Sequence, residues 1–485
     1  MMPQLGAIQN VAPLLLATGW ALFVLIAEMF SVDRRHVGIG WLTIVGLGTV
    51  AWIANPAGSG TDPIFASVVA QDGLTSYVTH LICALTMLSV LMAIDYIPKT
   101  GVQGGEHYPL ILFAVVGLIV MAAATDLVVM FLGLETMSMA VYVLAGLWKR
   151  ETRSNEAALK YFLLGAFASG FMLYGIALLY AVAGSTLLPD VAAAAASDLP
   201  SEQSTLLLLG VALLLVGFGF KVGAVPFHLW TPDVYEGAPT SVTAFMSTVV
   251  KLGAFAAMLR TVTVALAPVS GDLTLALWLT SAATMTVGNI VALKQTSLKR
   301  MLAYSSVAHT GYLLIGVTCG SEQGPAAVLF YLATYGAMNL AAFGIMMLIS
   351  RQGSGAERIS DYAGLGQSNP MLALAMTICM LSLTGIPPLA GFMGKLYLFS
   401  AALEAGHEIL VVVAVLNSVI SAAYYLGVVR VMYLDPPRDN VSASGGHLAI
   451  GTLIAVAAVI ALGLMPGAVL DAARSAAASI VLGSG

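Results

Sequence analysis

Long runs of apolar residues, separated by short polar segments, account for most of this chain of 485 residues. A helix that spans a lipid bilayer needs about 20 such residues, and in lipid only helices and closed barrels satisfy every backbone polar group. The runs are continuous and do not alternate with polar residues, which excludes barrel strands. We therefore predict an all-α polytopic membrane protein with fourteen spanning helices, at residues 11–30, 37–54, 74–97, 108–124, 126–148, 157–183, 205–225, 240–260, 273–293, 300–319, 324–350, 370–402, 408–434 and 448–465.

The composition excludes the soluble classes of protein. Hydrophobic residues make up 59% of the chain and charged residues 9%, whereas a soluble domain carries about 25% charged residues. The net charge of −5 argues against a nucleic-acid partner. The three cysteines lie far apart in apolar runs and match no metal-ligand spacing, so we expect no metal site.

The positively charged residues predict an orientation in the membrane. Of the 19 Lys and Arg residues, thirteen lie in loops or near span ends on one side of the predicted bundle, whereas Arg260 and Arg474 lie on the other. Because cytoplasmic loops carry the excess of Lys and Arg, we predict both termini on the periplasmic side of a bacterial plasma membrane. The thirteen are Arg34, Arg35, Lys99, Lys149, Arg150, Arg153, Lys294, Lys299, Arg300, Arg351, Arg358, Arg430 and Arg438.

The remaining four cations are all lysines inside predicted spans. Lys221, Lys251 and Lys395 lie deep, whereas Lys160 lies about a turn from the cytoplasmic end of its helix. Glu135 is the acidic residue at comparable depth. A charge at mid-bilayer costs about 2.5–3.5 kcal/mol, so its default interpretation is functional. Since a desolvated Lys can lose its proton and an Arg does not, we interpret this set as a proton relay.

Part of this set has a structural alternative. Glu135 and Lys221 could form an ion pair that only holds helices together, although that leaves the other deep lysines unexplained. His228 follows the seventh predicted helix and His309 lies in the tenth. Each is a candidate proton carrier, because imidazole titrates near neutrality, or else a hydrogen-bonded packing residue. The histidines do not form facing pairs on adjacent helices, so we do not expect haem.

Two predicted spans contain helix-breaking residues beside a lysine. Residues 217–226 hold three glycines and Pro226 around Lys221, and residues 385–395 hold three glycines, Pro387 and Pro388 before Lys395. As one helix, residues 370–402 would extend about 50 Å, against a hydrocarbon core of about 30 Å. We therefore predict that this span is broken, with simple kinks as the alternative.

Paired interruptions indicate an internal repeat. The interrupted spans are the seventh and the twelfth, so each repeat would hold five helices, at residues 108–260 and 273–434. Five is an odd number, so the two units would be inserted upside down relative to each other. Residues 1–107 would form three further N-terminal helices, and residues 435–485 the fourteenth helix and a tail.

Three segments carry a family resemblance. Residues 132–138 (LGLETMS), 220–240 (FKVGAVPFHLWTPDVYEGAPT) and 251–253 (KLG) resemble the antiporter-like membrane subunits of proton-pumping NADH:quinone oxidoreductase, respiratory complex I. Multisubunit cation/proton antiporters and membrane hydrogenases belong to the same superfamily. Complex I has three such subunits, and the lysine at 395 and the short C-terminal end resemble the one nearest the quinone-bearing arm.

The resemblance implies a function and a set of site residues. The family places a Glu on helix five and lysines on helices seven, eight and twelve, which are Glu135, Lys221, Lys251 and Lys395 here. It implies outward proton translocation coupled to quinone reduction elsewhere, with other membrane-arm subunits as partners. Flavin, iron–sulfur clusters, NADH and quinone would be bound by other subunits, and this chain would hold no cofactor. A cation/proton antiporter subunit and a non-pumping scaffold remain the alternatives.

Overall fold

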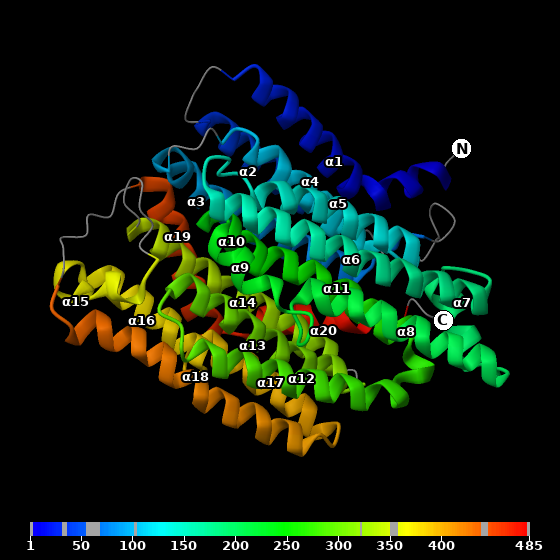
Figure 1. The fold of residues 1–485 in the computed structure, drawn as a ribbon. Helices are drawn as coiled ribbons and strands as arrows, with labels where there is room; N and C mark the ends of the chain where they lie inside the picture. The colour runs from blue at the N-terminus through cyan, green and yellow to red at the C-terminus, as the bar shows by residue number, and fades with distance from the viewer. Residues whose placement is uncertain are drawn as a thin grey trace.

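The computed structural model describes residues 3–31, 36–54, 68–100, 104–320, 323–349, 357–437 and 445–482. These residues form a bundle of helices, most of which run in one general direction (Figure 1), and they contain no strand beyond three isolated bridges. The helices are α1 (Pro3–Met29), α2 (Val37–Ile53), α3 (Gly73–Lys99), α4 (His107–Ala123), α5 (Leu127–Ala145), α6 (Thr152–Ala183), α7 (Leu188–Ala196), α8 (Ser201–Val222), α9 (Trp230–Gly237), α10 (Thr240–Phe245), η1 (Met246–Val250), α11 (Lys251–Arg260), η2 (Thr261–Ala265), η3 (Ala267–Val269), α12 (Ser270–Ala292), α13 (Leu298–Thr318), α14 (Gln323–Ile349), η4 (Ile359–Tyr362), α15 (Leu365–Ser368), α16 (Pro370–Thr384), α17 (Ala390–Glu404), α18 (Glu408–Leu434), α19 (Gly446–Leu464) and α20 (Gly467–Leu482).

The predicted all-α polytopic fold is confirmed. Each of the fourteen predicted ranges overlaps at least one helix. Within the described residues, ten helical segments are long and apolar enough to cross a membrane, and α2, α4 and α16 are shorter apolar helices. The number of fourteen spans stays a prediction. The predicted break within residues 370–402 is present, because α16 ends at Thr384 and α17 begins at Ala390.

Polar side chains fix where several of these helices begin. Asp72 accepts a hydrogen bond from the backbone of Thr75 at the start of α3, and Asp126 accepts from Val128 and Val129 at the start of α5. Ser297 and Asn369 do the same for α13 and α16. Such N-caps satisfy backbone donors that the first turn leaves open, so the polar breaks between apolar runs mark the helix starts.

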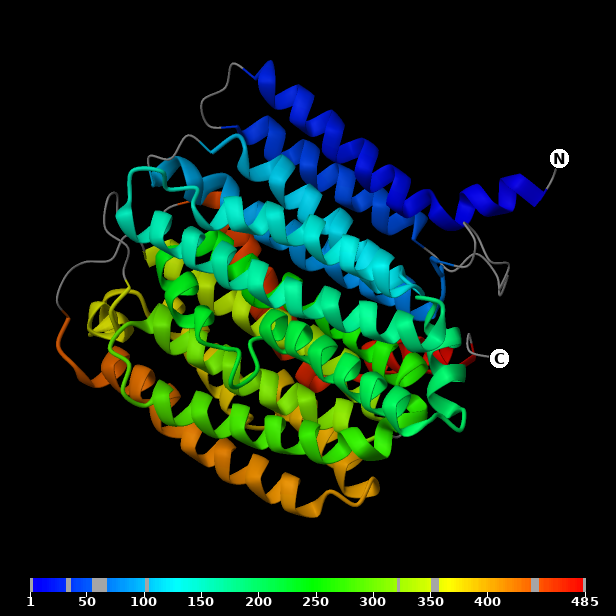
Figure 2. The same cartoon turned by 45° about the vertical axis from the view of Figure 1, so that its right-hand side comes forward.

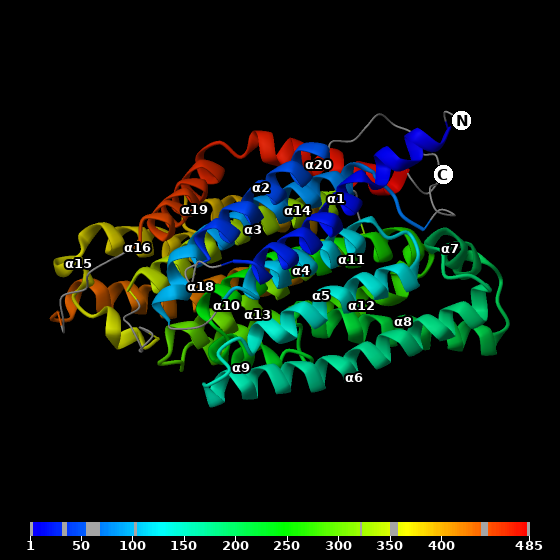
Figure 3. The same ribbon diagram turned by 90° about the horizontal axis from the view of Figure 1, so that it is seen from above.

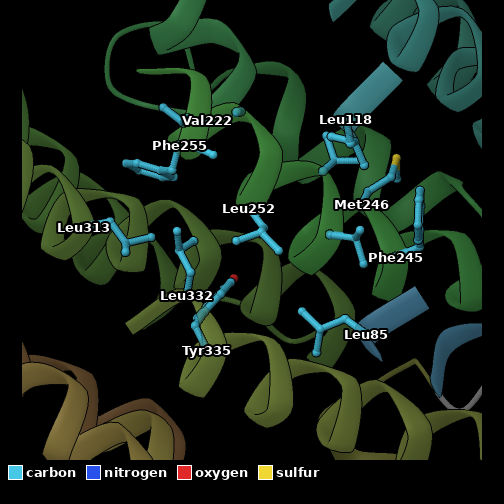
Figure 4. Packing of buried hydrophobic residues seen from close by; sticks show 14 of the residues in the cluster. Leu85, Leu118, Val222, Phe245, Met246, Leu252, Phe255, Leu313, Leu332 and Tyr335 are labelled. Carbon is cyan, nitrogen blue, oxygen red and sulfur yellow. The ribbon is translucent and has the colours of Figure 1, made fainter. Parts of the chain in front are cut away.

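Two helical segments form the centre of the molecule. The most apolar stretch of the segment from Thr240 to Ala265, which joins α10, η1, α11 and η2, is completely buried inside the chain, and so is the most apolar stretch of α14. Figure 4 shows Leu252 of α11 between Leu118 of α4 and Leu332 and Tyr335 of α14. The surrounding helices α1, α6 and α18 expose most of their surface instead. A polar group on the central helices is therefore shielded from lipid by the chain itself.

Glycines set how closely neighbouring helices approach. A Cβ on Gly117 of α4 would lie 2.5 Å from the carbonyl oxygen of Gly133 on α5, and one on Gly175 of α6 would lie 2.6 Å from that of Gly210 on α8. Lipid tails are as apolar as leucine, so helices in a membrane associate through such close packing rather than through the hydrophobic effect. These glycines hold α4 against α5 and α6 against α8.

Several described helices were not predicted from the sequence. Short helices α7, α9 and α15 lie in predicted loops, as do the one-turn helices η3 and η4, and α20 occupies the segment predicted as a tail. Helix α20 packs against α3 and α14. In Figures 1, 2 and 3 the first residues of α1 and the end of α20 lie at the same end of the bundle, beside α7 in Figures 1 and 3.

Two cations lie elsewhere than predicted. Arg260 is 3% exposed and donates to both carboxylate oxygens of Asp72, at 2.6 and 2.9 Å. Lys299 is fully buried and donates to the carbonyl oxygens of Glu236 and Ala238, at 3.1 and 2.6 Å. Both cations therefore join helices. The orientation argument counted them with the loop cations, whereas the structure shows them buried. Of the other cations in that argument, Arg34, Arg35, Arg351 and Arg438 lie outside the described residues.

Candidate functional site

Lys251 lies at the centre of the molecule, on the first residue of α11. It follows the π-helical turn η1, and π turns are frequent at functional sites. Its side chain is 3% exposed, and its ammonium donates to the carbonyl and hydroxyl oxygens of Ser306, both at 2.7 Å. The ring of Tyr335 lies 5.2 Å from the same nitrogen. The ammonium is thus held by oxygen atoms and a π face, with no carboxylate within 4.0 Å among the described residues.

Helix α13 carries a row of polar residues that begins at Ser306. Ser306, His309 and Tyr312 follow one another at intervals of three residues, and Ser305 lies four residues before His309; residues three or four apart on a helix lie on one face. All four are buried. The predicted site residue His309 therefore lies next to the lysine that the sequence placed on another helix.

Both ring nitrogens of His309 have hydrogen-bonding partners. Nδ1 lies 2.6 Å from the hydroxyl of Tyr331 on α14, and Nε2 lies 3.3 Å from the hydroxyl of Tyr425 on α18. The Tyr425 hydroxyl also bonds the hydroxyl of Ser305. The ring of Tyr312 is 5.7 Å from the His309 ring, centroid to centroid. His309 is therefore a junction between α13, α14 and α18.

Lys395 lies beside the break between α16 and α17. Gly385 ends α16 with a φ of 95°, a left-handed conformation that favours glycine. The ammonium of Lys395 folds back over this glycine and donates to the carbonyl oxygen of Thr384 at 2.8 Å and to the hydroxyl of Ser418 at 3.1 Å. Ser418 in turn donates to Tyr312 at 3.2 Å. Lys395 thus joins the polar row of α13 at its far end.

Lys221 lies beside the other interruption. Helix α8 is regular through Val222 and ends at Gly223, whose φ is 75°. The chain then turns until α9 begins at Trp230. The ammonium of Lys221 is surrounded by rings. It lies 5.2 Å from the ring centroid of Tyr142 and 5.4 Å from that of Tyr161, and it donates to the Tyr142 hydroxyl at 3.4 Å.

Glu135 makes no direct ion pair with Lys221. In the described structure its partner is Ser169 of α6, whose hydroxyl donates to the carboxylate. Glu135 is partly exposed on the outer side of α5, whereas Lys221 is 4% exposed. Both lie near α6, so they interact through space across the Tyr142 and Tyr161 region rather than by contact.

Thr310 connects the end of α8 with Lys251. Its hydroxyl lies 2.7 Å from the carbonyl oxygen of Val222 and 3.1 Å from that of Ser306. The residue next to Lys221 and the residue that binds Lys251 therefore share one hydroxyl group. The sequence contains no sign of this contact, because it depends on how α8 packs against α13.

Lys160 lies in a group of surface charges rather than beside the buried lysines. Its side chain is 42% exposed and pairs with Glu156 at 2.7 Å and with Asp233 at 2.9 Å. Asp233, on α9, also accepts from Arg300 at 2.9 Å. Partial burial alone would raise the pKa of Asp233, but the hydrogen bonds and charges of Lys160 and Arg300 outweigh it and hold this pKa below its ordinary value. The cluster ties α9 to α6 and α13.

His228 lies in the turn between α8 and α9. It is 8% exposed, and its Nδ1 has no hydrogen-bond partner within the described residues. Burial lowers the pKa of His228 below its ordinary value, so the ring is neutral near pH 7. A neutral ring with one open nitrogen can accept or pass a proton.

A cavity of about 1040 Å³ lies at the far end of α13, α14 and α17. Its lining begins one helical turn beyond the polar row: Gly316 follows Tyr312 by four residues, and Ala327 precedes Tyr331 by four. His407 and Arg474 also line it. The row that starts at Lys251 therefore ends close to a large cavity.

The site thus brings together residues from distant parts of the sequence. Hydrogen-bonding side chains extend from Lys251 along α13 to Lys395, in steps of one hydrogen bond or one helical turn. Sequence reasoning found both lysines and His309 but missed the groups between them, which are Ser305, Ser306, Thr310, Tyr312, Tyr331, Ser418 and Tyr425. Serines and tyrosines are common in membrane helices, and only the packing distinguishes these. The described residues contain no group of three or more His, Cys, Asp or Glu that could hold a metal ion.

The chain is similar in sequence to a large group of membrane proteins. Residues 124–421 match the family model described as "NADH:quinone oxidoreductase/Mrp antiporter, TM". The chain is 43% identical over 458 residues to NADH-quinone oxidoreductase subunit N of Trichlorobacter lovleyi, covering 93% of each chain. It is 44% identical over 469 residues to NADH-quinone oxidoreductase subunit N 1 of Herpetosiphon aurantiacus, covering 94% of each.

Solved structures agree with this similarity. One chain of the respiratory complex I from Thermus thermophilus with bound Aureothin superposes with a TM-score of 0.80 at 35% identity, covering 95% of this chain and 98% of that one. A chain of the Mrp complex from Dietzia superposes with a TM-score of 0.81 at 23% identity, covering 98% of both. At that lower identity the likeness shows a common fold.

Proposed function

Since the chain belongs to the NADH:quinone oxidoreductase/Mrp antiporter family, and within it to the subunit N chains of NADH-quinone oxidoreductases, we propose that it translocates protons. Buried lysines and His309 would pass each proton across the membrane, in step with quinone reduction elsewhere in the complex. The observation that carries this proposal is the row of hydrogen-bonding groups on α13 between Lys251 and Lys395.

Protons enter from the cytoplasmic side near His228 and Lys221. His228 has an open ring nitrogen in the turn after α8, and Lys221 lies just before that turn. Thr310 lies within hydrogen-bonding distance of both the end of α8 and the residue that binds Lys251. This contact holds α8 against α13, and the proton passes from Lys221 to Lys251 between these helices, while Lys160 acts at the cytoplasmic surface.

Protons leave by way of His309 and Lys395. His309, held by Tyr331 and Tyr425, can exchange a proton through either ring nitrogen. Tyr312 and Ser418 continue the path to Lys395. The cavity beyond Gly316 and Ala327 supplies the outlet on the periplasmic side.

Glu135 sets the balance of charge at the start of this path. Its carboxylate compensates the charge of Lys221 through space rather than by contact. When a change elsewhere in the complex weakens this compensation, the ammonium of Lys221 repels that of Lys251 more strongly, and Lys251 releases its proton towards Lys395. Coupled groups of this kind titrate as a set.

The chain works as one subunit of a larger membrane assembly. Its partners are other membrane-arm subunits, including another antiporter-like subunit, and these other subunits bind NADH, FMN, iron–sulfur clusters and quinone. The partly exposed Glu135, on a face lined by exposed apolar residues such as Leu132 and Met139, supports contact with a neighbouring subunit. A half-exposed carboxylate at bilayer depth needs such cover.

Two inverted five-helix units, residues 108–260 and 273–434, account for the two interrupted helices. Each unit holds one interrupted helix, which ends at a left-handed glycine and has a lysine beside the break. We place the chain in a bacterial plasma membrane with both termini in the periplasm. Labelling of single cysteines at Lys149 and Ser185 with an impermeant thiol reagent tests this orientation: Lys149→Cys should react only from the cytoplasm and Ser185→Cys only from the periplasm.

The decisive experiment is Lys251→Ala in the assembled complex. We expect proton-coupled NADH oxidation in membrane vesicles to fall about tenfold or more, which corresponds to roughly 1.4 kcal/mol. Lys294→Ala, a lysine on the exposed surface, is the control and should pump normally. Full NADH oxidation with full proton stoichiometry in Lys251→Ala would overturn the relay and leave a scaffold role. Sodium-dependent transport without quinone reduction would indicate an antiporter instead.

A further inference from the structure

Helix α18 is a peripheral helix that carries two partners of the buried row. It lies at the edge of the bundle in Figure 1, and it exposes Ile409, Leu416 and Val419 on its outer side. On its inner side Ser418 bonds the ammonium of Lys395 and Tyr425 bonds His309. An outer helix therefore has to be held accurately for these two contacts to form.

A buried pair of amides holds α18 against α12. Nδ2 of Asn289 on α12 donates to Oδ1 of Asn417 on α18 at 3.1 Å, and Nδ2 of Asn417 donates back to the hydroxyl of Thr286 at 3.2 Å. Asn289 is fully buried and Asn417 is 3% exposed. Each amide also donates to the carbonyl oxygen four residues earlier in its own helix. Both N–H groups of each side-chain amide therefore have a hydrogen-bond acceptor.

Tyr424 completes this connection from α18. Its hydroxyl donates to Oδ1 of Asn289 at 2.9 Å. Asn417 and Tyr424 are seven residues apart and lie on one stripe of α18, which faces α12. Ser418 and Tyr425 are also seven residues apart and lie on a second stripe, rotated by about 100°. When Asn417 and Tyr424 are bound to α12, the rotation of α18 is set, and with it the direction in which Ser418 and Tyr425 point.

We propose that Asn289 and Asn417 are positioning residues for the proton path, an inference that rests on the proposed function. They set the rotation and axial position of α18, so that Ser418 reaches Lys395 and Tyr425 reaches His309. A slip of one residue would move α18 by about 1.5 Å and turn it by about 100°, and both contacts would be lost. Leucine-lined contacts in lipid give no comparable register, because lipid tails compete equally well for them.

The test uses Asn289→Leu, Asn417→Leu and the double variant in the complete complex. We expect each single variant to assemble and to lower proton pumping about three- to tenfold, the range expected for one interhelical hydrogen bond. The double variant should lose more than either single variant but less than the sum of the two losses, because the Asn289–Asn417 bond is common to both, whereas the bond to Thr286 and the bond from Tyr424 are lost separately. The pH profile of pumping should change in these variants, since the path itself is altered.

Two control variants separate positioning from general stability. Thr452→Val removes a buried hydroxyl that bonds only within α19, and it should leave both rate and pH profile unchanged. Asn417→Gln, which keeps an amide, should recover part of the lost pumping. Pumping that follows only the amount of assembled complex, or losses that add in the double variant, would overturn the inference.

Lys395→Ala in the same assay separates this inference from the proposed function. If Lys395→Ala stops pumping while both Asn→Leu variants pump normally with an unchanged pH profile, the amides have no positioning role and the relay stands. If Lys395→Ala also pumps normally, the relay itself is wrong, and the positioning proposal fails with it.

Discussion

The two interrupted helices use the same backbone device and hold their lysines in different ways. Both α8 and α16 end at a left-handed glycine, with φ of 75° at Gly223 and 95° at Gly385. At the second break, the ammonium of Lys395 bonds a carbonyl and a hydroxyl oxygen at 2.8 and 3.1 Å. At the first, Lys221 lies among aromatic rings, with one hydroxyl at 3.4 Å.

This difference matters because oxygen dipoles stabilise an ammonium in one place, whereas ring faces hold it less specifically. Lys221 can respond to a charge that changes at Glu135, since no strong local bond fixes it. Lys395 is fixed to the end of α16 and to α18. We conclude that the first break is suited to receiving a signal and the second to delivering a proton along a fixed path.

The largest effect should come from replacing each lysine by arginine, which keeps the charge but does not release its proton. Both Lys221→Arg and Lys395→Arg should lower proton pumping by more than about tenfold. Arginine stacks on aromatic faces, and Lys221 lies among three rings, so Lys221→Arg should assemble normally. Lys395 also lies over a ring, that of Tyr312 at 4.7 Å, but there the larger group would displace the bonds to Thr384 and Ser418 and should be rejected. Measured amounts of assembled complex and pumping rates test this, and equal assembly of the two variants would contradict the comparison.

Replacing Gly223 or Gly385, the glycines that end α8 and α16, by alanine should lower stability similarly but should affect proton pumping differently. A left-handed conformation costs a non-glycine residue about 1–2 kcal/mol, so Gly223→Ala and Gly385→Ala should both lower the thermal stability of the complex. A Cβ at Gly385 would also lie 3.0 Å from Cδ of Lys395, so only this variant should slow pumping severalfold. Gly406→Ala, at a φ of 79° with open space around it, is the matched control for strain alone. Similar pumping in all three variants would show that the Lys395 contact is unimportant.

Removing one hydroxyl at each break should affect the two sites unequally. Ser418→Ala deletes an oxygen that accepts from Lys395, and a hydrogen bond to a charged group contributes about 1.5–3 kcal/mol, so pumping should fall about tenfold. Tyr142→Phe deletes only the hydroxyl at 3.4 Å and keeps the ring, so we expect less than about a threefold change. Initial rates of proton uptake by vesicles give both values. A larger loss in Tyr142→Phe than in Ser418→Ala would contradict the conclusion that Lys395 is held more firmly than Lys221.

The smallest effect should come from the charged cluster after the first break. The pKa of Asp233 lies below its ordinary value of 3.8, so its ion pairs stabilise the fold fully above that pH and weaken as pH falls through the lowered value. Exposed pairs of this kind contribute less than about 1 kcal/mol. Asp233→Asn should therefore lower the melting temperature slightly at neutral pH, and this difference from the unaltered protein should shrink below about pH 4. A difference that grows on acidification would show that Asp233 is not stabilised as a carboxylate.

The sequence predicts most of the long helices of this molecule well, because each apolar run is a local feature that can be recognised without knowing the rest of the fold. The break at Gly385 was also predictable, since residues 370–402 are too long for one span. Helix α20 was missed because Asp471 and Arg474, which lie on its exposed side, interrupt the apolar run along the sequence. The π turn before Lys251 was missed because no residue type marks that geometry.

The candidate site was predictable only at its charged members. A lysine in an apolar run stands out, whereas Ser306 or Tyr425 could equally be a packing residue. Which face of α13 meets Lys251 is decided by close packing against several helices, and that information is not local in sequence. For the same reason the direct contact between Glu135 and Lys221, plausible from their depths, is replaced by a bond from Ser169.

The cavity that reaches Gly316 and Ala327 has an electrical consequence. Where solvent penetrates, the membrane voltage cannot drop, so it falls mainly over the remaining protein between the cavity and the cytoplasmic surface. A proton moving there works against about 2.3 kcal/mol per 100 mV. Most of the energy that this chain stores in the membrane potential would then be added between this cavity and the cytoplasmic surface, the part of the path that holds Lys251 and His309, not evenly along the whole thickness of the bilayer.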